Sequence, residues 1–191
     1  MILIKSAFWM VLAAFLCCCA CACLTAGPSE NQTSGGPSVI DKTPRDEPAN
    51  VTFENAWQKL SYYESTGALN LTGVTIHQIY GTGVDARGNA SSWIVGVQQG
   101  NTSSLLVYDR ESWRQVSWGE SFTSPYITFD QILLPTEIYD TNSQTIENTM
   151  NANGVKDSDI DLSDGVYTIS IRSSNGLSQL RYNATTGELL S

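Results

Sequence analysis

All five cysteines of this 191-residue chain lie between Cys17 and Cys23, close to its amino terminus. The remaining residues contain no thiol, which excludes a disulfide framework, a cysteine metal site and a cysteine nucleophile from the main part of the chain. A domain built from that part has to be held together by its apolar core. With 41% hydrophobic and 15% charged residues, the composition is that of an ordinary globular protein.

The cysteines follow a segment that is typical of export signals. Lys5 precedes an apolar run over residues 7–16, and small residues end the segment, which predicts a secretory leader over residues 1–24. An uncleaved membrane helix over residues 2–24 is one alternative, because about 20 apolar residues span a bilayer. Simple cleavage with release of the protein is another. In each case the rest of the chain is exported.

The cysteine cluster resembles the lipid-attachment site of lipoprotein signals, in which a cysteine follows a small residue. Cys21 follows Ala20 and Cys23 follows Ala22, so these two cysteines are the predicted lipidation sites. Cysteine acting as a small hydrophobe inside the signal is the simpler interpretation. A lipid anchor would hold the protein at the cell surface, on the extracytoplasmic face of the membrane.

Residues 25–50 predict a flexible linker. They are rich in Gly, Pro, Ser and Thr, and they hold too few apolar side chains to offset the entropy lost on ordering. Asn-x-Ser/Thr triplets, the acceptors of N-glycosylation, occur in the linker and beyond it. A surface rich in Asn, Ser and Thr also produces such triplets without any glycan. The candidate acceptors are Asn31, Asn50, Asn70, Asn89, Asn101 and Asn183.

Beyond the linker, the apolar pattern predicts two α+β units, over residues 51–120 and 121–191. Phe53, Ala56, Trp57 and Leu60 recur at helical spacing, which predicts a helix over residues 53–63. Alternating runs that end at turn residues then predict hairpin strands. These strands cover residues 74–80, 92–98, 104–108 and 113–118, with a loop marked by Gly81, Gly83 and Gly88.

The second unit repeats this order. Thr141 and Gln144 fit a capping box at the start of a helix, and Gly154 stands where that helix would end. Strands are predicted over residues 165–170 and 177–182, joined by a turn at Asn175-Gly176. The predicted fold class is therefore α+β, an antiparallel sheet of hairpins with two helices packed on one face.

Residues 143–190 resemble a PepSY domain, a small module of one helix and an antiparallel hairpin. The resemblance rests on the ending RYNATTGELL, with its Thr-Gly-Glu triplet, and on the preceding GVYTISIRSSNGLSQL. Residues 53–118 resemble a diverged copy, in which Val107-Tyr108-Asp109-Arg110 stands near the ending without Thr-Gly-Glu. The chain would then hold a tandem pair of helix-strand-strand units.

The PepSY resemblance implies a non-catalytic, secreted or membrane-associated module that modulates or inhibits a peptidase. It carries no shared binding residues onto this chain. The succession of leader, linker and acidic domain with glycosylation triplets also resembles surface lipoproteins of archaea.

The sequence offers little that could carry catalysis or bind a cofactor. His77 is the only histidine, and no nucleophile motif accompanies it, so we expect it to face solvent or to lie on an edge strand. Gly81 and Gly83 lack the third glycine of a dinucleotide fingerprint, and no phosphate-binding loop occurs. The formal net charge of −9 argues against nucleic-acid partners, which require a basic patch.

The spacing of Asp157, Asp159 and Asp161 resembles the opening of a calcium loop. Leu162 stands where that loop needs glycine and Thr168 where it needs glutamate. A solvated loop leading into a hairpin is the simpler interpretation, and these aspartates are only a weak calcium candidate.

Three tryptophans of the first unit are ambiguous between the core and a face that binds sugar or peptide: Trp93, Trp113 and Trp118.

Three functions remain from the sequence. The leading hypothesis is a non-catalytic, membrane-anchored binding module with an extracytoplasmic protein partner such as a peptidase, contacted through an exposed sheet edge. The second is a glycosylated structural lipoprotein of the cell envelope. The third is a hydrolase that uses two carboxylates, which would require a concave pocket holding both of them.

Overall fold

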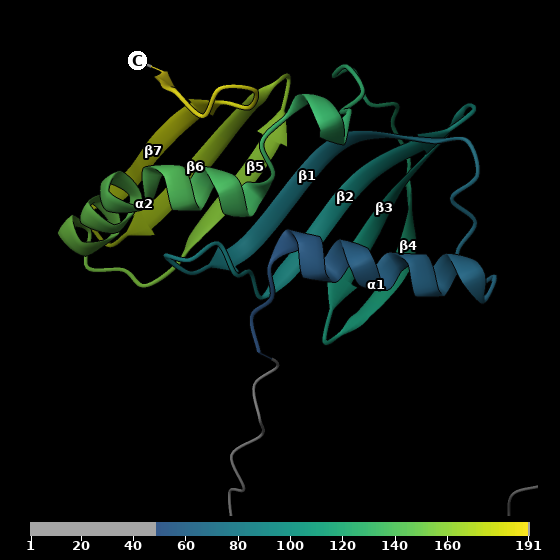
Figure 1. Cartoon of the computed structure of the whole chain (residues 1–191), viewed down its shortest axis with the longest axis horizontal. Coiled ribbons are helices and arrows are strands. Elements are labelled where there is room, and N and C mark those ends of the chain that lie inside the picture. The colour runs from purple at the N-terminus through teal and green to yellow at the C-terminus, as the bar shows by residue number, and fades with distance from the viewer. Residues whose placement is uncertain (1–48, 191) are drawn as a thin grey trace, which may run out of the picture. The chain divides into compact units, whose positions relative to one another are not determined.

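The structure, a computed structural model, describes residues 49–190. In this range one antiparallel sheet of eight strands, in the order β4-β3-β2-β1-β5-β6-β7-β8, carries two helices on one of its faces (Figure 1). The predicted fold class is thereby confirmed. The leader with Cys21 and Cys23, and the linker up to residue 48 with Asn31, lie outside the described residues.

The first half of the fold, residues 53–118, is a helix followed by a four-stranded meander. Thr52 caps the helix by accepting a hydrogen bond from the backbone N–H of Asn55, at 3.2 Å. The predicted helix and the four predicted strands are all present. They are α1 (Phe53–Ser65), β1 (Val74–Val84), β2 (Ser92–Gln99), β3 (Thr102–Asp109) and β4 (Ser112–Trp118).

The second half, residues 135–190, has the same order of elements. A short 3-10 helix, η1 (Phe129–Gln131), precedes the second half. The elements of the second half are α2 (Pro135–Ala152), β5 (Ser158–Ser163), β6 (Val166–Ser173), β7 (Gly176–Asn183) and β8 (Leu189–Leu190). Each half thus holds one helix and four strands, rather than the helix-strand-strand unit that the sequence suggests.

The halves join where β1 pairs with β5, at the centre of the sheet. The pairing is antiparallel. Tyr80 faces Asp161, and the neighbouring pairs are Ile79–Leu162 and Gly81–Ile160. The amino-terminal turns of the helices also meet, because the Thr136 hydroxyl donates to the Glu54 carboxylate at 2.6 Å. The core is one continuous cluster of buried residues from both halves.

An aromatic side chain ties each helix to the sheet in the same way. Trp93, the second residue of β2, donates from Nε1 to the carbonyl of Val51, two residues before α1, at 3.0 Å. Tyr167, the second residue of β6, donates to the carbonyl of Leu133, two residues before α2, at 2.8 Å. The halves are therefore related by an approximate two-fold rotation.

The start of the second helix was predicted wrongly. The helix begins at Pro135, so Thr141 and Gln144 lie inside it. Proline suits the first turn, where its missing N–H leaves no bond unmade, and Glu137 accepts from the backbone N–H of Leu134 at 2.6 Å. The predicted end is confirmed, since Gly154 follows directly after the cap residue Asn153.

Three predicted loops or turns also differ. Gly81 and Gly83 lie within β1 instead of in a loop, and Gly88 alone of the three lies between strands. The aspartate segment is mostly β5, whose Ser158, Ile160 and Leu162 are buried. The β6–β7 turn consists of residues 174–175, one residue earlier than predicted, because Ser173 pairs with Gly176.

Among residues 49–190, no helix combines the length and the apolar character needed to cross a membrane.

Candidate functional site

The face of the sheet opposite the helices carries polar side chains from adjacent strands. Alternate residues of a strand point to opposite faces, so the positions next to the buried core residues project to this open face. Two rows of facing residues follow from the register: Asp159–Ser170–Gln179 and Tyr80–Asp161–Thr168–Arg181. We call these seven residues, together with Arg172 and Gln78, the polar face.

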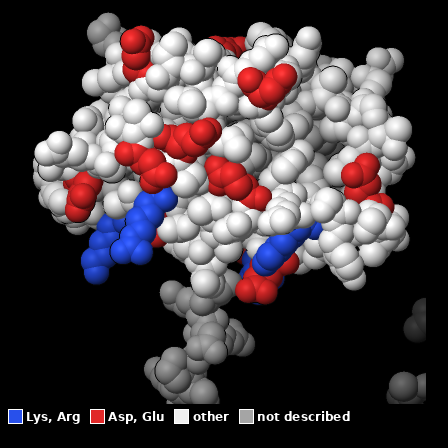
Figure 2. Space-filling model, viewed as in Figure 1, with Lys and Arg blue, Asp and Glu red and all other residues white. Residues whose placement is uncertain are grey.

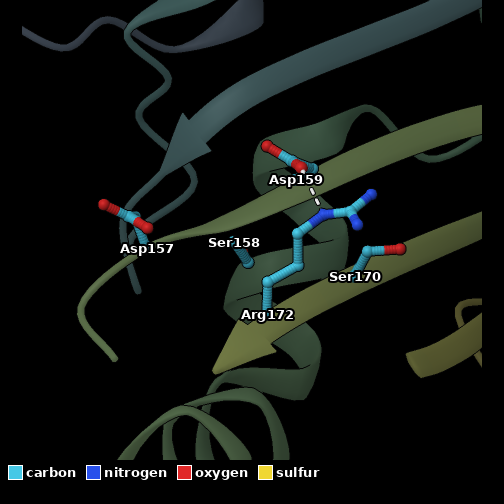
Figure 3. A pocket seen from close by; sticks show the side chains of 5 residues that line it. All are labelled: Asp157, Ser158, Asp159, Ser170 and Arg172. Atoms are coloured by element: carbon cyan, nitrogen blue, oxygen red, sulfur yellow. Dashed lines mark ion pairs between the residues drawn. The ribbon is translucent and has the colours of Figure 1, made fainter. Parts of the chain in front are cut away.

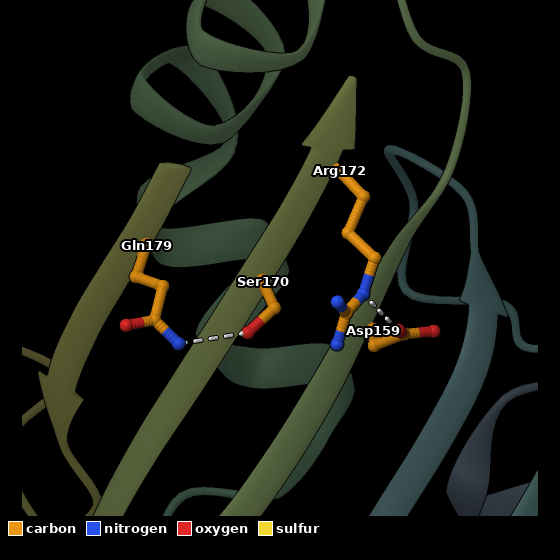
Figure 4. A network of polar contacts seen from close by, with 4 residues as sticks. All are labelled: Asp159, Ser170, Arg172 and Gln179. Atoms are coloured by element: carbon orange, nitrogen blue, oxygen red, sulfur yellow. Dashed lines mark hydrogen bonds and ion pairs between the residues drawn. The ribbon is translucent and has the colours of Figure 1, made fainter. Parts of the chain in front are cut away.

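Charged and amide groups from neighbouring strands contact one another on the polar face (Figure 4). Arg172 Nε on β6 lies 3.6 Å from Asp159 Oδ2 on β5. Gln179 on β7 donates to the Ser170 hydroxyl at 3.2 Å. The Arg172 side chain is 72% exposed, so its ion pair adds at most about 1 kcal/mol to stability and leaves the guanidinium accessible to a ligand.

The central aspartate of the polar face is held more firmly. Asp161 accepts from Gln78 Nε2 at 2.6 Å and from the Ser163 hydroxyl at 2.9 Å. Its neighbour Tyr80 is half-buried, and this burial, followed by the negative charge of Asp159, raises the pKa of the Tyr80 phenol. The Tyr80 phenol therefore stays protonated to a higher pH than an ordinary tyrosine.

A shallow hollow opens at one end of the polar face (Figure 3). It is lined by Asp157, Ser158, Asp159, Ser170 and Arg172, and its volume is about 70 Å³. Pockets that enclose a small-molecule ligand span about 300–1,000 Å³. The hollow has room for one functional group of a larger molecule.

The weak calcium candidate is not assembled in the fold. Asp159 pairs with Arg172, while Asp161 is engaged by Gln78 and Ser163. Within residues 49–190, no three His, Cys, Asp or Glu side chains gather closely enough to hold a metal ion. The extended backbone of β5 is the reason, because a calcium loop has to curl its ligands around one centre.

The candidate glycosylation sites differ in accessibility. Asn50, Asn70 and Asn101 are exposed, whereas Asn89 and Asn183 are half-buried. The Asn89 amide nitrogen, the atom that would carry a glycan, donates to both carboxylate oxygens of Asp85 at 3.2 and 3.0 Å.

His77 lies neither on an edge strand nor free in solvent, contrary to the prediction. It stands in β1, near the centre of the sheet, and is half-buried. Its Nδ1 lies 2.7 Å from the carbonyl oxygen of Ser124, and its ring stacks on Phe122 with centroids 5.6 Å apart. His77 therefore fastens the segment after β4 to the sheet.

The three ambiguous tryptophans divide between core and surface. Trp93 and Trp113 are buried, and each indole donates to a backbone carbonyl at or just before α1. Trp118, at the end of the edge strand β4, is 45% exposed.

The helix-bearing side of the molecule is predominantly acidic. Figure 2 shows acidic side chains spread over this side, with basic side chains near its lower margin. Helix α2 contributes Glu137, Asp140 and Glu147 and carries neither Lys nor Arg. The two sides of the molecule thus present different chemistry to a partner.

The sequence did not single out Arg172, Ser170 or Gln179 as site residues. A usable signal was present in β6, where Thr168, Ser170 and Arg172 alternate with the buried Tyr167, Ile169 and Ile171. The pairing of these residues with Asp159 and Gln179 depends on strand register, which the sequence leaves open.

Comparison with known proteins yields one solved structure. The chain is similar to a protein of Clostridium difficile 630 described as a putative lipoprotein, with 13% sequence identity and a TM-score of 0.44. The likeness covers 74% of this chain and 91% of that protein, and at this level it carries no functional argument. No protein-family model matches the chain, and no curated protein matches it.

Proposed function

We propose that this chain is a non-catalytic binding module, held on the extracytoplasmic face of the cell membrane by its amino-terminal leader, and that the polar face contacts a partner protein there. A peptidase is the partner class that the PepSY resemblance favours. The export signal and the cysteine cluster support the location, and the linker would give the folded part reach.

The observation that carries the binding role is the division of the sheet into a covered and an open side. Both helices pack on one side (Figure 1), while three adjacent strands of the second half place Asp159, Ser170 and Gln179 in one row on the other. Side chains at fixed spacing on a sheet are preorganised, which lowers the entropy cost of binding. The small volume of the hollow favours contact with a surface over enclosure of a substrate.

The PepSY-like ending has a structural role that agrees with this proposal. Gly187 adopts a φ of +72°, and a Cβ atom there would lie 2.9 Å from Leu133 Cδ1. Its carbonyl accepts from Asn142 Nδ2 on α2 at 3.1 Å, and its N–H donates to Asn183 at 2.8 Å. The triplet thus fastens the β7–β8 turn to the helix, so the motif supports an architecture and does not supply a binding residue.

Mass spectrometry of the mature amino terminus tests the anchor. We expect a diacylated Cys21 or Cys23 in the membrane fraction. An intact Met1, or an unmodified start downstream of the cysteines, would refute the lipid anchor.

Site-specific photocrosslinking in intact cells tests the binding surface. A photoreactive residue at Gln179, on the polar face, is compared with one at Gln144, which is also an exposed glutamine and lies on α2. We expect a discrete protein adduct from position 179 and none from position 144. Arg172→Ala should abolish that adduct, whereas Arg87→Ala, which removes an exposed arginine from a loop, should leave it intact. Equal adducts from both positions, or none from 179, would rule out the polar face.

A further inference from the structure

A second concavity lies at the end of the β5–β6 hairpin and is separate from the polar-face hollow. It encloses about 280 Å³ between the segment that precedes α2 and the hairpin turn at Asp164 and Gly165. Its wall is fixed, because the Thr185 hydroxyl donates to the carbonyl of Gln131 at 3.1 Å and the Leu133 N–H donates to Ala184 at 2.8 Å. The cavity is therefore a preformed feature of the fold. We call it the hairpin pocket.

The first half shows why this space stays open. There the connection between β1 and β2 is long, and Ala90 within it exchanges two backbone hydrogen bonds with Val51, just before α1, at 2.9 and 3.0 Å. The corresponding β5–β6 turn has only the residues Asp164 and Gly165 between its paired ends. In the second half Ala184, from the β7–β8 turn, lies between the two: it accepts from the Leu133 N–H at 2.8 Å and donates to the Gly165 carbonyl at 2.9 Å. Ala184 thus spaces the segment before α2 from the hairpin turn.

The lining of the hairpin pocket combines an apolar floor with one negative charge. The partly buried Ile127 and Ile132 supply the apolar part, and Asp164 is the only charged residue among the lining residues. The sole ion pair within residues 49–190 joins Arg172 to Asp159, so Asp164 has no cationic partner there. Tyr126, also in the lining, is 67% exposed.

We propose that the hairpin pocket receives a lysine or arginine side chain of a partner polypeptide. The aliphatic stem of such a side chain would lie on the two isoleucine side chains. Its charged head would meet the Asp164 carboxylate and the face of the Tyr126 ring, which attracts cations. The chain's net charge of −9 favours the approach of a basic segment. This inference rests on the proposed function at one point, since the partner protein proposed there supplies the cationic side chain.

Amide chemical-shift titration of the full chain in detergent micelles tests the pocket with defined probes. The probes are acetyl-Ala-Lys-Ala-amide, its arginine counterpart, and the same tripeptide with norleucine or glutamate in place of lysine. We expect the two cationic peptides to shift the amides of residues 125–132 and 164–165. The norleucine and glutamate peptides should not shift them.

Two matched pairs of variants locate the interaction. Asp164→Asn should weaken lysine-peptide binding about two- to fivefold, because Asp164 is exposed, whereas Asp157→Asn, with the same change in net charge, should leave it unchanged. Tyr126→Ala should weaken it about two- to fivefold, whereas Tyr62→Ala, at a position with 66% exposure, should not.

The titration separates this inference from the proposed function. Equal weakening by Asp164→Asn and Asp157→Asn would show attraction by net charge alone and would overturn the pocket. The absence of any amide shift at 10 mM peptide would overturn it as well, because a dissociation constant above about 10 mM is too weak to be useful. A cationic peptide bound at the pocket, with no adduct from Gln179 in cells, would uphold the pocket and refute the polar face.

Discussion

The backbone of β1 runs so close to Trp93 that only glycine fits at position 81. A Cβ atom on Gly81 would lie 2.5 Å from Cζ3 of the Trp93 ring. The ring cannot withdraw easily, because it is fully buried and its indole nitrogen is bonded to Val51. A methyl group at position 81 would therefore force the strand and the ring apart.

We predict that Gly81→Ala lowers the free energy of unfolding by about 1–3 kcal/mol, the usual cost of overpacking a core. Urea denaturation followed by tryptophan fluorescence measures the change. Gly119→Ala is the control, because no heavy atom lies within 4 Å of a Cβ atom built there, and it should change stability by less than about 0.5 kcal/mol. Equal stability of the two variants would contradict the packing argument.

The facing pair Tyr167 and Tyr182 gives a second prediction at this scale. Both side chains are fully buried, but the Tyr167 hydroxyl donates to Leu133 whereas the Tyr182 hydroxyl has no partner. Tyr167→Phe should cost about 1 kcal/mol, because a hydrogen bond is lost and a carbonyl is left unpaired. Tyr182→Phe should be neutral or stabilising. Urea midpoints compare the two, and a loss of stability in Tyr182→Phe would show that its hydroxyl has a partner in solution.

Residue patterns revealed the face of each strand but not the reason for each glycine. Glycine is rare inside strands, so the sequence predicts a loop at Gly81 and Gly83. The ring that requires Gly81 comes from Trp93, on the neighbouring strand, and the sequence of β1 alone contains no trace of it.

Among the elements, the β3–β4 hairpin carries an unusual turn. Both of its central residues have positive φ, 48° for Arg110 and 65° for Glu111. Turns of this type favour Asn-Gly, since a side chain in this region costs of order 1 kcal/mol or more. We predict that Arg110→Asn with Glu111→Gly raises the free energy of unfolding by about 1 kcal/mol, measured as an increased urea midpoint.

Charge effects are separated from backbone effects by a matched variant. Arg110→Gln with Glu111→Gln removes the same two charges but keeps a side chain at both positions, and it should give no gain. An equal gain from both double variants would attribute the effect to charge.

The helices and strands that sequence periodicity predicted are those with a clear buried stripe, such as α1 with Phe53, Ala56 and Leu60. Two errors have local causes. Thr141 and Gln144 match the spacing of a capping box but lie inside the helix, and Pro135 gives the actual start. The aspartates of β5 predict a solvated loop, although Ile160 and Leu162 alternate with them toward the core.

The candidate site was less predictable than the fold. The spacing of Asp159 along the chain makes it a candidate from sequence alone, but its ion-pair partner Arg172 lies on another strand. Which side chains meet across strands is set by register and by the central join of β1 and β5, neither of which leaves a local signature.

For the whole molecule, the single core predicts a single unfolding transition. All tryptophans of residues 49–190 lie in the first half, at positions 57, 93, 113 and 118. The longer helix, α2, lies in the second. Ile160→Ala, which removes buried volume from the second half, should therefore shift the tryptophan-fluorescence transition by the full loss of about 2–5 kcal/mol. Circular dichroism should report a coincident transition, and two separate transitions would show that the halves unfold independently.

Buried phenols predict a loss of stability at alkaline pH. Burial raises the pKa of Tyr139, Tyr167 and Tyr182 above the usual value near 10. The unfolded chain then loses these protons at a lower pH than the folded one, so stability is complete below about pH 10 and falls as the pH rises beyond it. Thermal melting between pH 8 and pH 12 measures this, and Tyr182→Phe should reduce the slope. A melting temperature that is constant above pH 10 would contradict the prediction.

The antiparallel seam between β1 and β5 has an evolutionary consequence. The register is symmetric over Ile79–Leu162, Tyr80–Asp161 and Gly81–Ile160, and it shifts before Val84–Ser158. Exchanging the two halves therefore leaves these three central pairs in place. Two identical copies of one half could meet along the same seam as a symmetric dimer. Gene duplication followed by fusion could then have produced the present chain, with residues 119–134 as the new bridge and each half free to diverge on its own surface.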